Sequence, residues 1–235
     1  MAKPGKIIVI EGTDSSGKNT QTKLLLERLN SEGFHSEIMS FPRYDTPTGR
    51  VIAQCYLGKK GIGTGDTGWF GDADSIDPRL ISLYYAADRL AAAPEILEKT
   101  QGGINMILDR YYQSNMAHQG GKIKTDSERG AFFEFERILE LELLKIPKED
   151  IAILLHMPTR VAVELRKGRG LEADLHESNI GHLIRAENAY LHMIKNYWYA
   201  WKLISCAPDS TINSLRTPED IAEEVYSHVK KVISS

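Results

Sequence analysis

The sequence contains no apolar run that approaches the roughly 18 residues needed to cross a membrane. Its N-terminal residues lead into only four apolar residues, Ile7 to Ile10, which are too few for the core of a signal peptide. Its two cysteines, Cys55 and Cys206, lie far apart without metal-ligand spacing, so we expect both to stay reduced. These absences predict a cytoplasmic protein with no membrane partner.

A strong excess of one charge is also missing. The net charge of −3 gives no bulk attraction to nucleic acid, which predicts no nucleic-acid partner. The seven histidines form no HExxH or other zinc-binding pattern. No motif suggests a Ser-His-Asp triad either, so the sequence does not favour this type of nucleophilic catalysis.

What the sequence does have is enough apolar content, 42% of 235 residues, to bury one core as a single domain over 1–235. Short apolar runs alternate with amphipathic stretches, which is typical of an α/β fold with a parallel sheet covered by helices. We expect strands near Lys6–Glu11, Ser36–Phe41, Ile104–Asp109, Ile151–His156 and Ser210–Asn213. We expect helices over Asn19–Ser31, Thr48–Leu57, Pro78–Lys99, Ser127–Leu144, Arg160–Lys167, Ile180–Ile204 and Pro218–Val232. Helical spacing of the apolar residues in Ile180–Ile204 predicts that this stripe is core.

Two polar stretches interrupt this pattern. Residues 59–77 hold five glycines and four aspartates, which predicts a flexible loop and not a domain linker. Residues 167–178 are rich in arginine, glycine and acidic residues and lie between two expected helices. With Arg166 and Arg169 at its start, this stretch could be a short lid that closes over a triphosphate, or only a solvated loop.

The most informative stretch runs from Ile10 to Thr22, between an expected strand and an expected helix. Its G-x4-G-K spacing, Gly12 to Lys18, matches the Walker A phosphate-binding motif, although Asn19 stands where Ser or Thr is usual. In this context the loop and helix N–H groups converge on an anion, and the lysine supplies a point charge for the β- and γ-phosphates. The alternative is a surface lysine after a chance pair of glycines. The expected ATP-binding residues are Gly12, Thr13, Asp14, Ser15, Ser16, Gly17, Lys18, Asn19 and Thr20.

Asp14 is unusual in such a loop, because polyphosphate repels a carboxylate. It fits better if it faces a magnesium ion or the hydroxyl of a second ligand, and otherwise it caps the loop.

Polar residues also follow other strands at the same edge of the expected sheet. Asp109 and Arg110 come directly after one strand, where a carboxylate can hold Mg²⁺ and a guanidinium can bind a phosphate. Arg43 and Tyr44 occupy the same position after the second strand. Asp109 and Arg110 could instead form a structural ion pair.

Tyr85 and Arg89 are four residues apart on an expected helix and therefore share a face. An aromatic ring and a cation on one face could hold a flat base and its phosphate, although such pairs also cover the edge of a core.

Together these segments resemble the thymidylate kinase family of P-loop nucleoside monophosphate kinases, which phosphorylate dTMP with ATP. The resemblance runs from Ile7 to about Asn188 and rests on motifs in the order of the family. These are Glu11–Gln21, Phe41-Pro42-Arg43-Tyr44, Asp88-Arg89, Asp109–Gly120 and the lid from Arg166 to Glu177. It implies a three-layer P-loop NTPase-type fold with a five-stranded parallel sheet flanked by helices and a short lid. It also implies Mg²⁺ as cofactor, ATP and dTMP as ligands, and a homodimer.

The resemblance further implies roles for the matched positions. Lys18 and the loop amides would bind the donor phosphates, and Asp14 would meet the 3′-hydroxyl of the acceptor. Asp109, Glu177 and possibly Asp14 would serve the metal, and the lid arginines Arg166 and Arg169 would act in catalysis with Lys18 and Arg110. The residues that would line the acceptor site are Asp14, Phe41, Arg43, Tyr44, Tyr85, Arg89, Arg110, Ser114, Asn115, His118 and Gln119. His118 departs from the family, which usually has an aromatic residue there as a check on deoxyribose.

Two other functions stay open from the sequence. A related kinase could accept dUMP or a deoxynucleoside, and a P-loop regulator could bind nucleotide without phosphorylating a small molecule.

Overall fold

The computed structural model describes residues 3–59, 68, 70–169, 180–196 and 201–235. The elements in chain order are β1 (Ile7–Glu11), α1 (Lys18–Ser31), β2 (Ser36–Ser40), α2 (Pro47–Val51), the π-helical turn η1 (Ile52–Leu57), α3 (Pro78–Gln101), β3 (Asn105–Asp109), α4 (Tyr112–Gly120), α5 (Asp126–Arg137), the π-helical turn η2 (Ile138–Leu143), β4 (Ile151–His156), α6 (Thr159–Arg169), α7 (Ile180–Asn196), β5 (Trp201–Ser205), the 3₁₀ turn η3 (Ile212–Ser214) and α8 (Pro218–Ser234).

The sheet has five parallel strands in the order β2-β3-β1-β4-β5. β1 lies at its centre, where Ile8 pairs with Ile107 of β3 on one side and with Ile151 of β4 on the other. All five residues of β1 are buried, because a central parallel strand is covered on both faces. The strands that follow β1 lie first on one side of it, as β2 and β3, and then on the other, as β4 and β5. Ligands of such sheets bind at this change of side, beyond the carboxyl ends of the strands.

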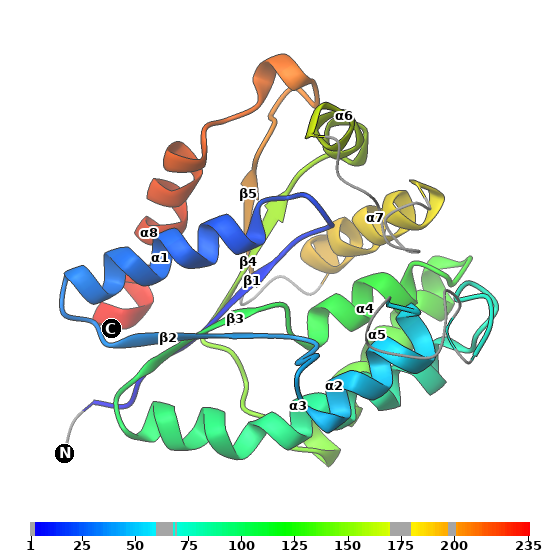
Figure 1. The fold of residues 1–235 in the computed structure, drawn as a ribbon, viewed down its shortest axis with the longest axis horizontal. Coiled ribbons are helices and arrows are strands. Elements are labelled where there is room, and N and C mark those ends of the chain that lie inside the picture. The colour runs from blue at the N-terminus through cyan, green and yellow to red at the C-terminus, as the bar shows by residue number, and fades with distance from the viewer. Residues whose placement is uncertain (1–2, 60–67, 69, 170–179, 197–200) are drawn as a thin grey trace.

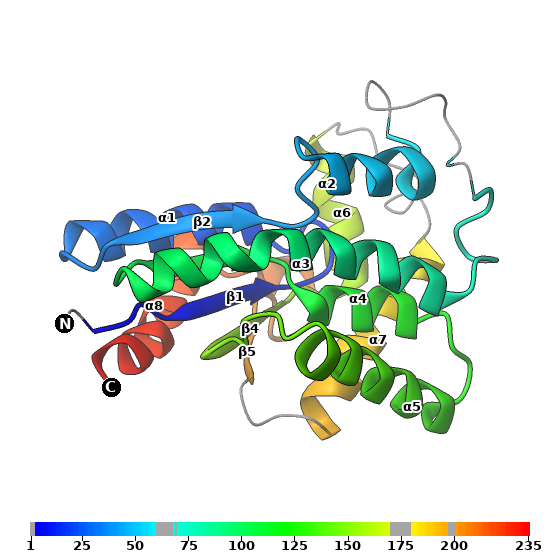
Figure 2. The same ribbon diagram turned by 90° about the horizontal axis from the view of Figure 1, so that it is seen from below.

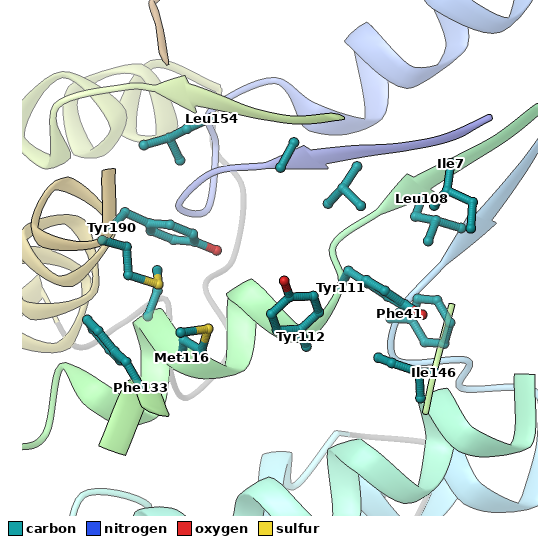
Figure 3. Packing of buried hydrophobic residues seen from close by; sticks show 14 of the residues in the cluster. Ile7, Phe41, Leu108, Tyr111, Tyr112, Met116, Phe133, Ile146, Leu154 and Tyr190 are labelled. Atoms are coloured by element: carbon teal, nitrogen blue, oxygen red, sulfur yellow. The ribbon is translucent and has the colours of Figure 1, made fainter. Parts of the chain in front are cut away.

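Side chains alternate between the two faces of the sheet and so fill two separate cores. Ile8 and Ile10 pack with α1 and α8, whereas Ile7 and Val9 pack on the side of α3, α4, α5 and α7. Figures 1 and 2 show these two helical layers on either side of the sheet. Figure 3 shows the second core, in which Tyr111 and Tyr190 approach the strands. The predicted five-stranded parallel α/β fold is confirmed.

The fifth predicted strand is wrong, and so is the C-terminal end of the helix expected over Ile180–Ile204. α7 ends at Asn196, and β5 is formed by Trp201–Ser205, which pairs with β4. Residues 210–213 lead instead into η3. β5 is an edge strand in which only Ile204 is buried, so its sequence lacks the apolar run of the inner strands. Trp201 and Ile204 are three residues apart, and this spacing of apolar residues resembles that of one helix face, so the helix was predicted to extend too far.

The other helices lie close to their predicted ranges, and the N-cap of α8 follows its sequence pattern. Thr217 accepts a hydrogen bond from the Asp220 N–H at 3.1 Å, with Pro218 at the first helical position. The sequence analysis predicted neither a helix over residues 112–120, where α4 lies, nor a π-helical turn. None of the helices in the described part of the chain has the length and apolar content that a bilayer crossing requires.

Candidate active site

A loop between β1 and α1 forms the first half of the site. Gly12 has φ +155°, and a Cβ there would lie 2.4 Å from Ser16 Oγ and 2.8 Å from the Leu155 carbonyl oxygen. Gly17 has φ +89° and is the N-cap of α1, so the loop turns directly into the helix. The first N–H groups of α1 have no intrahelical partner and face this loop, which makes it an anion site.

Lys18 lies across this loop. Its side chain is buried, and Nζ donates to the carbonyl oxygens of Gly12 at 3.0 Å and Thr13 at 2.9 Å. Burial, together with the positive charge of Arg110, lowers the pKa of Lys18 to about 8. The ammonium group is therefore still mostly charged at neutral pH, and a bound phosphate would raise this pKa again.

The hydroxyls of Thr13 and Ser16 are buried and bond to no partner among the described residues. Ser15, Asn19 and Thr20 are exposed on the loop and the first turn of α1. Unsatisfied buried hydroxyls are costly, so a ligand that bonds to them is stabilised.

The buried carboxylate of Glu11 connects the loop to α4. It accepts hydrogen bonds from the Tyr111 N–H at 2.8 Å, from Ser114 Oγ at 2.6 Å and from Tyr190 OH at 2.7 Å. Burial raises the pKa of Glu11. This carboxylate fixes the start of α4 against β1, and the sequence showed it only as part of a motif.

Arg110 stands where the loop and α4 meet. Its φ is +68°, and its guanidinium pairs with Asp14 and donates to Ser114 Oγ and His118 Nε2, both at 3.2 Å. Burial opposes its charge, but the carboxylates of Asp14 and Glu11 outweigh it, so the pKa of Arg110 is raised. The charge stays fixed at every working pH. His118 in turn stacks on His182 of α7, with ring centroids 5.4 Å apart.

Asp109 ends β3 beside the loop, and its Oδ1 is buried without a partner among the described residues. Such an orphaned carboxylate oxygen fits a Mg²⁺ ligand. Within the described ranges, no three His, Cys, Asp or Glu side chains gather around one point. Mg²⁺ is typically held by one or two carboxylates together with waters and substrate phosphates. Glu177 lies outside the described residues.

Beyond Arg110 opens a cleft of about 640 Å³, counting its part open to solvent. Of the eleven predicted acceptor residues, ten line it: Asp14, Phe41, Tyr44, Tyr85, Arg89, Arg110, Ser114, Asn115, His118 and Gln119. The structure adds Tyr56, Leu57 and His182, which the sequence analysis missed. Tyr56 and Leu57 come from η1, and no local pattern showed that this segment folds over α3.

Arg43 does not line the cleft but lies beside it. Its N–H donates to Asp88 Oδ2 at 2.9 Å and its Nε to Asp88 Oδ1 at 3.3 Å. The Phe41-Pro42 peptide before it is cis. Asp88 also accepts from Thr48 Oγ1 at 2.6 Å, so one buried carboxylate on α3 holds the turn that carries Arg43.

The floor of the cleft rests on two buried glutamates that the sequence analysis did not single out. Glu140 of η2 accepts from Arg89 Nε at 3.0 Å and also from its Nη2. Glu136 of α5 accepts from Asn115 Nδ2. Both glutamates are fully buried, and they are four residues apart, which places them on one face of a helix. Two carboxylates on an otherwise apolar helix face are unusual, and this pattern was the sequence signal that could have identified them.

The predicted lid is only partly described. Arg166 lies on α6 and is half-buried. The side chains of Lys167 and Arg169 and the whole segment 170–179 lie outside the described residues, as do 60–67 and 69 of the predicted flexible loop.

Comparison with known proteins gives a consistent result. A family model described as thymidylate kinase matches residues 10–211. The human thymidylate kinase is 26% identical over 206 residues, which cover 88% of this chain and 84% of the human protein. A probable thymidylate kinase of Pyrococcus abyssi is 32% identical over 167 residues, which cover 71% of this chain and 72% of the Pyrococcus protein. The solved structure of the Candida albicans thymidylate kinase is similar in fold, with a TM-score of 0.69, 19% identity, and coverage of 97% of this chain and 92% of that one.

Proposed function

The chain belongs to the thymidylate kinase family, and we propose that its cleft is where the γ-phosphate of ATP passes to dTMP to give ADP and dTDP. An enzyme of this family is an ATP-dependent nucleoside monophosphate kinase. The observation that carries the proposal is Arg110, which joins a phosphate-binding loop to a second cleft through Asp14. A nucleotide-binding regulator has no use for the second site.

On the donor side, the loop amides, Lys18 and the free hydroxyls of Thr13 and Ser16 bind the phosphates of ATP. A phosphate oxygen of dTMP attacks the γ-phosphorus, and the bond to the bridging oxygen of ADP breaks, so no covalent enzyme intermediate forms. The chain's part is positioning and charge neutralisation. Asp109 and Glu177 would hold Mg²⁺, which would supply neutralising charge for the phosphate oxygens.

On the acceptor side, Arg110 and Arg43 bind the phosphate of dTMP, and Asp14 meets its 3′-hydroxyl. Tyr85 stacks on the base, and its ring already stands edge-on to Tyr56 with centroids 6.2 Å apart. Tyr44, Phe41 and Gln119 complete the wall. Arg166 and Arg169 close over the phosphates as part of a lid at 167–178, and residues 1–235 act as one kinase domain with a flexible loop at 59–77.

The homodimer is proposed through the outer face of α3. Leu80, Leu83, Leu90 and Leu97 are 40%, 50%, 42% and 42% exposed. Leu80 and Leu83 are three residues apart, and Leu83, Leu90 and Leu97 follow at seven-residue intervals, so they share one face of α3, which a second copy of α3 buries. Leu83→Glu with Leu90→Glu is expected to turn a dimer into a monomer in sedimentation, whereas a wild-type monomer would contradict the proposal.

From the composition we also propose a cytoplasmic location and no nucleic-acid or membrane partner.

The test of the function is ADP release with dTMP, dUMP, dCMP, dGMP and UMP as acceptors, with and without Mg²⁺. We expect dTMP to be the best acceptor and turnover to need Mg²⁺. Preference for dUMP, or a monophosphate product from a deoxynucleoside, would assign a related kinase. ATP binding without binding of dTMP would assign a regulator.

A further inference from the structure

The side-chain amide of Asn115 on α4 is held in one orientation. Its Nδ2 donates to both carboxylate oxygens of Glu136, at 3.2 Å and 3.0 Å. Its Oδ1 is buried and bonds to no described residue. Asn115 is 3% exposed and lines the cleft, and Oδ1 is the polar atom of its side chain that Glu136 leaves without a partner among the described residues.

Glu136 fixes this orientation because a carboxylate only accepts hydrogen bonds. The reversed amide would place Oδ1 against the carboxylate and lose both bonds. Glu136 is fully buried between α3, α4 and η2, so water cannot compensate such a loss.

Arg89 supplies the complementary group on the same floor. A guanidinium only donates, and Glu140 anchors it through Nε and Nη2. The floor therefore presents a donor from Arg89 and an acceptor from Asn115. Thymine offers the matching edge, with the acceptor O4 next to the donor N3–H, whereas cytosine presents a donor at N4 next to an acceptor at N3.

We propose that Glu136 is a positioning residue that sets base selectivity by holding the carbonyl oxygen of Asn115 toward the cleft. The proposal rests on the proposed function, in which a pyrimidine nucleotide occupies this cleft. The sequence analysis did not single out Glu136, and this residue does not line the cleft itself.

The protonation state of Glu136 provides a second way to test its effect on Asn115. Burial raises the pKa of Glu136 to about 7, although Ser82, Arg89 and Asn115 around it favour the ionised form and Glu140 opposes it. When protonated, Glu136 gains an O–H that can donate to Asn115 Oδ1 and stabilise the reversed amide.

The experiment compares kcat/KM for dTMP and dCMP in the wild type and in Glu136→Gln. The variant keeps the shape but gives residue 136 a donor, so the preference for dTMP over dCMP is expected to fall roughly 10- to 100-fold. The change is expected mainly in KM for the two acceptors, with kcat for dTMP retained. The matched control is Glu149→Gln, which removes another buried carboxylate, one that bonds to Tyr112 OH at 3.0 Å and does not line the cleft. It should leave the preference unchanged.

An unchanged preference in a folded, active Glu136→Gln enzyme would overturn the inference and leave the proposed function intact. A wild type that does not phosphorylate dTMP would defeat the proposed function instead. The wild type provides a measurement that does not depend on the variant's folding, namely the dTMP/dCMP ratio of kcat/KM between pH 6 and 8.5. The acceptor phosphate is common to both nucleotides, so its titration cancels in this ratio. The ratio is expected to rise through pH 7, and a flat ratio would contradict the inference.

Discussion

The two halves of the site are built in different ways. The donor half is one continuous segment, Gly12 to Lys18, whose ligand-binding groups are mainly backbone N–H groups and one lysine. The acceptor half gathers side chains from the ends of β2 and β3 and from η1, α3, α4 and α7. Its floor needs buried carboxylates on α5 and η2 to hold Arg89 and Asn115 in place.

This difference has a physical consequence for each half. A backbone site depends on local φ and ψ, so it persists when a single side chain is altered, and Lys18 is its one cationic side chain. A side-chain site depends on the desolvated partners behind it, so a residue that never touches the ligand can change what binds. Substitutions should therefore separate the two halves.

The largest effect is expected from the proposed lid, which would serve both halves. Arg166→Ala and Arg169→Ala should lower kcat on the order of 10³-fold, because a cation that neutralises the transferring phosphoryl group acts mainly in the transition state. Affinity for dTMP, measured by calorimetry, should change little. Arg160→Ala, exposed at the start of α6, is the control. Near-normal turnover in both variants would remove the lid from the mechanism.

Lys18→Met should come next, with kcat lowered roughly 10²- to 10³-fold while dTMP binding stays within a few-fold. Lys18 is the buried cation of the donor loop, and its Nζ contacts only loop carbonyls among the described residues. Lys23→Met, exposed on the same helix, is the matched control. A parallel loss of dTMP affinity would show that the halves are not separable.

Glu136→Gln should change stability in a pH-dependent way. Glu136 has an ordinary pKa of 4.5 when unfolded and about 7 when buried, so the folded state holds a proton that the unfolded chain releases. This carboxyl therefore stabilises the fold fully below pH 4.5 and loses that contribution as pH rises through 7, by about 3 kcal/mol. Relative to the variant, the wild type should lose stability over this window in denaturant titrations. Glu128→Gln, exposed on the same helix, is the control, and parallel curves for wild type and Glu136→Gln would contradict the expectation.

Arg43→Ala should raise KM for dTMP roughly 10- to 100-fold, the worth of a charge-assisted hydrogen bond, with KM for ATP unchanged. Steady-state kinetics with each substrate varied in turn separates the two. Arg50→Ala, an exposed arginine on α2, should match the wild type. If ATP is affected as strongly as dTMP, Arg43 does not belong to the acceptor half.

The smallest effect is expected from Asn19→Ala. The side chain is exposed on the first turn of α1, whereas Asp109 has a buried oxygen that bonds to none of the described residues and can serve the metal, so Mg²⁺-dependent turnover should fall less than 10-fold. Measurement across a Mg²⁺ titration distinguishes a weakened metal site from a weakened ATP site. Complete loss of activity would show that the Asn19 amide carries the metal.

The sequence predicted the inner strands because a buried parallel strand needs an apolar run, as in Ile7 to Ile10. It failed at β5, an edge strand with one buried residue, because pairing with β4 and not apolar pattern determines that strand. The predicted acceptor residues came from a family resemblance, and ten of them meet in one cleft. Tyr56, Glu136 and Glu140 were missed because their importance lies in what they touch across the fold.

The sequence by itself determined the phosphate loop, since the spacing of Gly12, Gly17 and Lys18 acts within a few bonds of backbone. Only the tertiary structure decided which atoms of Arg89 and Asn115 face the cleft. That choice belongs to Glu140 and Glu136, which are 51 and 21 residues away along the chain. Local geometry can be encoded locally, but the orientation of a buried polar group is set by the partner that replaces its water.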